Sequence, residues 1–188
     1  MSSGKDALAP PPRAVLELAE EARAYVRRAL SLELDGTDAT LPILDHYLGQ
    51  VPGERPEIAS LVGAAAGCYF GELLRARFGG RWLQEGAEPS AWRIELGDGS
   101  VSLQPWAMAQ RAITRSPDGP GDDTLLVPPH LRQALGEALA RLAPLSQDTY
   151  YSLAGRFDSL ETIVDVLAAI SRALGDDTGP GSAPVPGD

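Results

Sequence analysis

The sequence predicts an α+β fold in which a small antiparallel β-hairpin or three-stranded sheet packs on a buried central helix, with further helices at both ends. Three observations support this fold class. Residues 58–74 are apolar almost all round a helix, which is typical of a helix buried on most sides. Apolar and polar residues alternate on both sides of Gly97-Asp98-Gly99, as they do in a hairpin. The flanking segments repeat apolar residues at spacings of three and four, as amphipathic helices do.

Two helices are expected before the central one. The first covers residues 13–32, and its apolar stripe consists of Leu18, Ala22, Tyr25, Val26, Ala29 and Leu30. The second is short and covers residues 41–48. Thr40 is its candidate cap, Pro42 lies in its first turn and Gly49 follows its end, which is the usual placement of these residue types.

The central helix is expected to begin near Pro56 and to end at Gly79-Gly80. Gly63, Gly67 and Gly71 lie four residues apart, so they share one side of this helix. Each glycine costs a helix roughly 1 kcal/mol relative to alanine. Three in register therefore predict that another element approaches closely. A phosphate-binding loop is not indicated, because the Gly-Lys-Ser/Thr ending is missing.

Strands and further helices follow. A short strand is expected at residues 81–85, and the two arms of the hairpin carry Trp92, Ile94 and Leu96 and then Val101 and Leu103. Pro105 ends the hairpin, and residues 106–114 are expected to be helical. One more helix opens at Pro129 and another contains Tyr150. The last is expected to begin at Asp158, where Asp158 and Glu161 resemble a capping box, and to end at Gly175.

These elements predict a single domain over residues 13–174. Residues 1–12 and 175–188 are expected to be disordered tails, because they contain almost nothing to bury. Residues 116–124 are rich in proline, glycine and aspartate and are expected to form a flexible surface loop.

Charge and composition exclude several classes of partner. The net charge is -10 and the pI is about 4.6, so neither nucleic acid nor an anionic membrane is expected to bind. Cys68 is the only cysteine, so an intrachain disulfide cannot form. The first twelve residues lack the apolar core of a signal peptide, and the uncharged run 58–71 is too short to span a bilayer. A cytoplasmic location and a basic protein partner are therefore expected.

Residues 58–113 contain an ordered series of short motifs. Tyr69-Phe70-Gly71-Glu72-Leu73-Leu74 lies near the end of the apolar helix, and Gly79-Gly80-Arg81-Trp82 opens the first strand. Leu103-Gln104-Pro105 ends the hairpin, and Gln110-Arg111-Ala112-Ile113 ends the next helix. This series resembles a group of uncharacterised bacterial domains of unknown function. The resemblance implies an α+β fold and a bacterial cytosolic setting, and it implies no activity.

The sequence contains no recognisable catalytic, cofactor-binding or metal-binding pattern. His46 and His130 each lack a second histidine, a cysteine or a carboxylate at the spacing of metal ligands. Cys68 lies in the most apolar helix and has no base next to it in sequence. No catalytic residue, cofactor or metal is therefore expected.

Glu72 is the charge that most suggests a role, because it directly follows the uncharged run 58–71. A half-buried carboxylate there needs a cation, and Arg75, Arg81 and Arg111 are the candidates. We single out Glu72 and Arg111 as a functional or structural ion pair.

Four aromatic residues are candidates for an interface: Trp82, Trp92, Trp106 and Tyr151. The tryptophans gather around the hairpin, where packing is the ordinary role of an aromatic ring, and an outward-facing ring would anchor a partner. Tyr150 and Tyr151 lie about 100° apart on a helix, so one of the two is expected to face outward.

The function favoured by these features is a non-catalytic cytosolic protein-binding module that uses an acidic surface, such as an adaptor, an immunity-like inhibitor or a chaperone-like partner. One alternative is a small hydrolase-like enzyme with a site assembled from Glu72, Cys68, His46 and Arg111. Another is a structural module that forms homo-oligomers through its apolar C-terminal helix.

Overall fold

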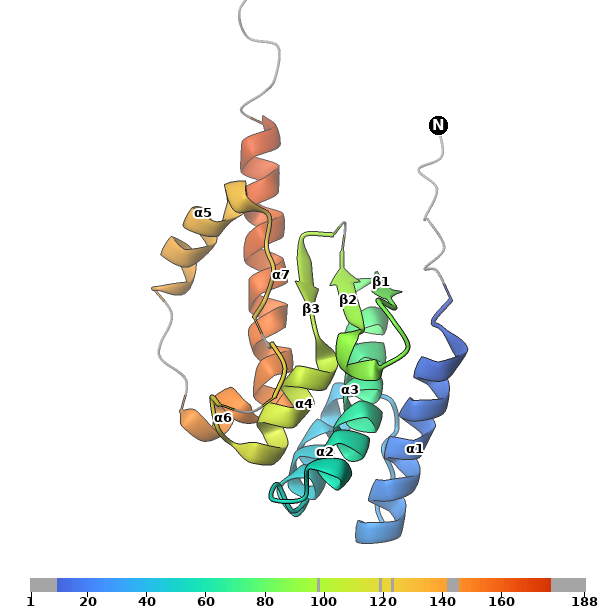
Figure 1. Cartoon of the computed structure of the whole chain (residues 1–188). Helices are drawn as coiled ribbons and strands as arrows, with labels where there is room; N and C mark the ends of the chain where they lie inside the picture. The colour runs from blue at the N-terminus through green and yellow to red at the C-terminus, as the bar shows by residue number, and fades with distance from the viewer. Residues whose placement is uncertain (1–9, 98, 119, 123, 142–145, 177–188) are drawn as a thin grey trace, which may run out of the picture.

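A computed structural model of the chain describes residues 10–97, 99–118, 120–122, 124–141 and 146–176. These residues form seven α-helices and one three-stranded antiparallel sheet, which confirms the predicted α+β class (Figure 1). The helices are α1 (Arg13–Leu30), α2 (Leu41–Leu48), α3 (Pro56–Phe78), α4 (Pro105–Thr114), α5 (Pro129–Leu139), α6 (Gln147–Tyr151) and α7 (Leu153–Asp176). The strands are β1 (Gly80–Leu83), β2 (Arg93–Leu96) and β3 (Val101–Leu103).

The sheet has the order β1-β2-β3, so the predicted hairpin is extended by one strand on its β2 side. Trp82 lies opposite Ile94, which in turn lies opposite Leu103. Residues directly opposite each other share a face, so these three side chains point to the same side of the sheet. Ile94 and Leu103 are fully buried, and the Trp82 ring lies against α3 at Gly71. This face of the sheet therefore covers the central helix.

Helix α3 forms the centre of the core. Tyr69, Phe70 and Leu74 are almost completely buried, with α1 and α4 packed against the helix along its length (Figure 1). Among the described residues, α3 is also the one helix that is long and apolar enough to cross a membrane by length and composition alone. Because 72% of its most apolar stretch is buried inside the protein, this composition matches that of a core helix.

Gly63, Gly67 and Gly71 form a glycine ridge along one side of α3, and α4 approaches the helix there, which confirms the prediction of a close contact. A Cβ atom at Gly67 would lie 2.8 Å from the backbone N and Cα atoms of Trp106. At Gly63 it would meet the side chain of Gln110, whose Nε2 donates to the carbonyl oxygen of Ala59 at 2.6 Å. The absence of side chains on this ridge lets the two helix backbones lie nearly in contact.

Helix α7 begins at Leu153, and the predicted start at Asp158 is wrong by five residues. The backbone amides of Leu153 and Ala154 donate to the two carboxylate oxygens of Asp45, at 2.7 and 3.0 Å. Asp45 belongs to α2, so the cap comes from a helix more than a hundred residues earlier in the chain. The local capping-box pattern at Asp158 was misleading because the first turn is capped by a tertiary contact.

Helix α1 ends at Leu30, two residues before its predicted end, because Ser31 adopts the left-handed conformation with φ 57°. The predicted tails 1–12 and 175–188 lie mostly outside the described residues, and α7 extends to Asp176. In the predicted loop 116–124, the amide of Asp122 donates to Oε1 of Gln104 at 3.3 Å. The flexibility of this loop stays a prediction.

Candidate functional site

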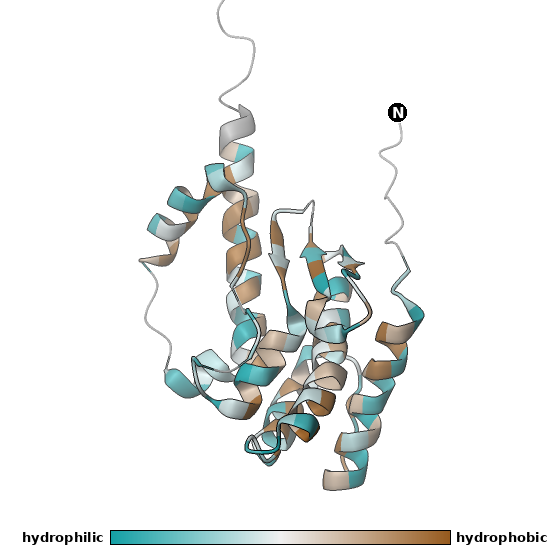
Figure 2. Cartoon of the chain, viewed as in Figure 1, coloured by the Kyte–Doolittle hydropathy of each residue, from teal (hydrophilic) through white to brown (hydrophobic). Residues whose placement is uncertain are grey.

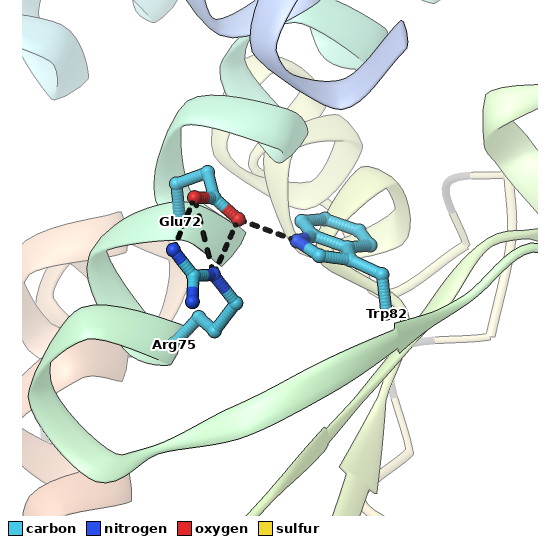
Figure 3. A network of polar contacts seen from close by, with 3 residues as sticks. All are labelled: Glu72, Arg75 and Trp82. Atoms are coloured by element: carbon cyan, nitrogen blue, oxygen red, sulfur yellow. Dashed lines mark hydrogen bonds and ion pairs between the residues drawn. The ribbon is translucent and has the colours of Figure 1, made fainter. Parts of the chain in front are cut away.

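Glu72 lies in the last third of α3, in a groove of about 220 Å³ between α1 and α3. Its carboxylate accepts from Nε of Arg75 at 3.0 Å (Oε1) and 3.2 Å (Oε2), and from Nη2 of Arg75 at 3.0 Å (Oε2). The indole Nε1 of Trp82 donates to Oε1 at 2.6 Å (Figure 3). The three residues therefore form one polar cluster that joins strand β1 to helix α3.

This cluster is shielded from water, since the side chains of Glu72 and Arg75 are only 18% and 15% exposed. Both carboxylate oxygens are engaged by charged or polar donors, and the Arg75 contact is a two-pronged one. The cluster thus positions the sheet on α3, and Glu72 has the half-buried, ion-paired environment expected from sequence.

The structure pairs Glu72 with Arg75, its neighbour one turn along α3, and it places Arg111 in a different contact. Arg111 belongs to α4, is buried, and donates through Nη2 to the carbonyl oxygen of Gly121 at 3.2 Å. Arg111 therefore ties the loop after α4 to the core. The two members of the predicted pair serve different parts of the fold.

The predicted interface aromatics divide into inner and outer ones. Trp92 is buried and its Nε1 donates to the carbonyl oxygen of Gly86 at 3.1 Å. Trp106 is half-buried and its Nε1 donates to the carbonyl oxygen of Ser60 at 3.4 Å. Tyr151 is 7% exposed whereas Tyr150 is 51% exposed, so the outward-facing tyrosine is Tyr150 and not Tyr151. Sequence periodicity could not decide between the two rings, because α6 is a single short turn.

Of the residues of the enzyme alternative, Cys68 and Glu72 lie one turn apart on α3, whereas His46 lies on α2 and Arg111 on α4. Cys68 is buried in α3, and burial together with the nearby charge of Glu72 raises the pKa of its thiol to about 12. His46 is exposed on α2 with its Nε2 2.9 Å from Nε2 of Gln50, and His130 is exposed at the start of α5. Within the part of the chain that the structure describes, no group of three or more histidine, cysteine, aspartate or glutamate side chains is arranged to hold a metal ion.

Cys68 should resist thiol reagents in the folded protein. A pKa of about 12 leaves about one thiol in ten thousand ionised at pH 8, and the side chain is also covered. We expect labelling by a disulfide reagent to be slow in buffer and complete within seconds in urea, with one label per chain. Rapid labelling of the native protein would contradict the buried position of α3.

A surface that the sequence analysis missed lies where α1 ends and α3 begins. Leu32, Ile58 and Leu61 are 47%, 38% and 55% exposed, and they are three of the six large hydrophobic side chains that are exposed in the described residues. Ile58 was expected to be buried with the rest of the apolar run. The first turns of α3 were misread because hydrophobicity alone does not tell a covered turn from an uncovered one.

The antiparallel packing of α1 on α3 brings these three leucine and isoleucine side chains to the same end of the molecule. Arg23 stacks on the ring of Tyr69, with its Cζ 5.3 Å from the ring centroid, and Leu16 lines the same groove as Leu73. The end of α1 and the first turns of α3 therefore lie toward the same end of the molecule (Figure 1). We call the surface formed by Leu32, Ile58 and Leu61 the base patch.

The segment that carries the base patch is rich in carboxylates. Residues 31–61 contain six aspartates and glutamates and one arginine, Arg55, whereas the last turn of α1 carries Arg27 and Arg28, and Arg27 pairs with Glu33. Glu54 and Glu57 are exposed and flank Ile58, and hydrophilic and apolar residues alternate at this end of the molecule (Figure 2). Exposed apolar side chains with a charged rim are typical of sites that bind another protein.

Comparisons with protein-family models, with curated proteins and with solved structures returned no match to this chain. The resemblance of residues 58–113 to uncharacterised bacterial domains stays a prediction.

Proposed function

We propose that this protein is a non-catalytic protein-binding module that recognises a basic, partly apolar segment of another protein through the base patch. The observation that carries the proposal is the exposure of Leu32, Ile58 and Leu61 at one end of an otherwise well-packed core. Isolated exposed leucines are common on protein surfaces, but three at one end are a candidate anchor for a partner.

Charge favours a basic partner. Glu54 and Glu57 are exposed near Ile58, and the net charge of -10 attracts lysine- and arginine-rich segments to the protein as a whole. Leu61 and Ile58 lie three residues apart on α3, so a partner helix or extended segment can contact both at once. Apolar anchoring would supply affinity, and the acidic rim would speed association and make it sensitive to salt.

The proposal is tested by capturing partners from a lysate of the native host at low and at high salt, and by measuring the affinity of the purified candidate. Leu61→Ser is expected to weaken binding about tenfold or more, because truncating a central apolar anchor typically costs more than 1 kcal/mol. Glu54→Gln combined with Glu57→Gln is expected to slow association at low salt while leaving the dissociation rate nearly unchanged.

Leu16→Ser is the matched control, since Leu16 is exposed to a similar degree but lies at the opposite end of α1. Equal losses with Leu16→Ser and Leu61→Ser would contradict a role for the base patch. A captured partner that is a second copy of this chain, seen as a dimer in solution mass, would instead support the homo-oligomer alternative.

A further inference from the structure

A second docking surface, independent of the base patch, lies at one edge of the sheet. In the described parts of the chain, β1 pairs with β2 alone. The opposite edge has a neighbour, because Leu126 and Ser102 of β3 exchange two backbone hydrogen bonds of 2.8 and 2.9 Å. The β1 edge is therefore the one that offers backbone donors and acceptors to a further strand.

The backbone groups that face the open edge belong to Gly80 and Trp82. In an antiparallel pair, residues that exchange hydrogen bonds alternate with residues that do not. The amide of Gly97 donates to the carbonyl oxygen of Gly79 at 3.1 Å, so Gly79 and, two residues later, Arg81 direct their backbone groups to β2. The N–H and C=O groups of Gly80 and Trp82 point the other way, and among the described residues no loop or turn forms a backbone hydrogen bond with them.

A groove with room for a side chain adjoins this edge. The indole of Trp82 crosses from β1 to α3 and donates to Glu72, which lines the groove of about 220 Å³ between α1 and α3 (Figure 3). Strand β1 also lies on the α1 side of the sheet (Figure 1). In a strand added beside β1, the residue opposite Trp82 shares the face of the indole, and its side chain is directed toward this groove.

The groove suits an uncharged aromatic ring. Its apolar lining consists of Leu16, Ala19, Leu73 and Ala76. The carboxylates of the lining are balanced by arginines of the same lining, Glu20 by Arg23 and Glu72 by Arg75. The volume exceeds the roughly 150 Å³ of an engineered cavity that holds benzene. A phenyl ring can therefore enter and pack on aliphatic side chains and on the flat face of a guanidinium.

The outer face of β1 selects by charge. Arg81 is 65% exposed and directs its Nε to the carboxylate of Glu95 on β2 at 2.8 Å. A guanidinium has five N–H donors, so a second carboxylate can accept from it as well. A carboxylate directly opposite Arg81 on an added strand is thus favourable, whereas a lysine there meets a like charge.

We propose that β1 binds an extended segment of another protein as a fourth, antiparallel strand. The antiparallel direction follows the two existing strand pairs, which are both antiparallel. The segment has an aromatic residue opposite Trp82, whose ring enters the groove between α1 and α3, and the next residue is a glutamate or aspartate opposite Arg81. Main-chain hydrogen bonds give affinity in this mode of recognition, and the pocket for an alternate side chain gives specificity.

The probe is the peptide acetyl-Thr-Thr-Phe-Glu-Val-Thr-amide, titrated into ¹⁵N-labelled protein. Saturable shifts are expected for the amide signals of Gly80 and Trp82, and smaller ones for Arg81, whose amide already faces β2. Replacing the phenylalanine of the peptide by alanine should weaken binding at least about fivefold, because an anchor in a pocket typically contributes more than 1 kcal/mol. Replacing its glutamate by lysine should weaken binding about threefold or more.

N-methylation of the peptide tests whether the contact is a strand pairing. A methyl group on the phenylalanine nitrogen blocks a hydrogen bond to β1, because the residue opposite Trp82 directs its backbone groups to that strand, and the saturable shifts should be lost. The same methyl group on the glutamate nitrogen points away from β1 and should change the affinity little. Equal affinity of the two methylated peptides would overturn the proposal, as would an unmodified peptide that moves neither the Gly80 nor the Trp82 signal.

Two protein variants separate this surface from the base patch. Leu16→Ser removes an apolar wall of the groove and should weaken the phenylalanine peptide at least about threefold, while changing the affinity for the alanine peptide little. Leu61→Ser is the matched control, because Leu61 is exposed to a similar degree but belongs to the base patch. Equal weakening by the two variants would show that the ring does not use the groove, and the proposal would fail.

Discussion

Replacing Gly67 by alanine is expected to lower the free energy of unfolding by about 1–3 kcal/mol, although alanine is the better helix former. The added methyl group would lie 2.8 Å from the backbone N and Cα atoms of Trp106 and 2.9 Å from the carbonyl carbon of Pro105. Backbone atoms cannot rotate away as the end of a side chain can, so α3 and α4 must separate. Urea unfolding followed by circular dichroism measures the loss.

Gly136→Ala is the matched control for this substitution. Gly136 lies inside α5, and a Cβ atom there would meet nothing within 4 Å. The same change of residue should therefore raise the free energy of unfolding, by up to about 1 kcal/mol, through helix propensity alone. Opposite signs for the two variants would verify the close approach of α4 to the glycine ridge. A Gly67→Ala protein as stable as the wild type would refute it.

Replacing Asp45 by alanine is expected to destabilise the protein by about 2–3 kcal/mol, since the loss of a helix cap leaves two amides at the start of α7 without their acceptors. The amides of Leu153 and Ala154 both donate to this carboxylate. Asp45→Asn should cost less, about 1 kcal/mol, because asparagine keeps one side-chain oxygen, which can replace the acceptor of one of the two amides. Thermal or urea unfolding of the two variants compares the loss of both acceptors with the loss of one acceptor and the charge.

The pH dependence of the same pair of proteins tests the environment of Asp45. Burial raises the pKa of this carboxyl group above its ordinary value, and it outweighs the lowering effects of the Ala154 and Leu153 amides and of Arg115. A raised pKa in the folded state means that the folded protein binds the proton more tightly than the unfolded chain does. The stability of the wild type relative to Asp45→Asn should therefore increase as the pH falls through the folded pKa towards the ordinary one. A relative loss of stability in acid would contradict this balance.

Most of the fold could be predicted because its signals are local. Helices α2 and α3 begin and end close to the expected positions, at prolines and glycines whose backbone preferences act on their immediate neighbours. The alternation around Gly97 and Gly99 predicted two of the three strands, and the glycine ridge predicted the contact with α4. Each of these inferences needs only the few residues around one point of the chain.

The candidate site could be predicted only in part. Glu72 was recognisable as a half-buried charge, because it follows an uncharged run on the same helix. Its partner among three arginines was not, since that choice depends on the rotation of α3 and on the position of β1. The base patch was not recognisable either, because it is defined by which side chains other elements leave uncovered.

The sequence by itself determined where the chain forms helices and strands, and it determined the acidic charge of the protein, because periodicity, turn residues and composition are properties of neighbouring residues and of their sum. Only the tertiary structure decided that Asp45 caps α7 and that Tyr150 faces outward while Tyr151 is buried. These features join residues that are far apart in the chain. Their geometry is set by how whole elements pack, which no local pattern encodes.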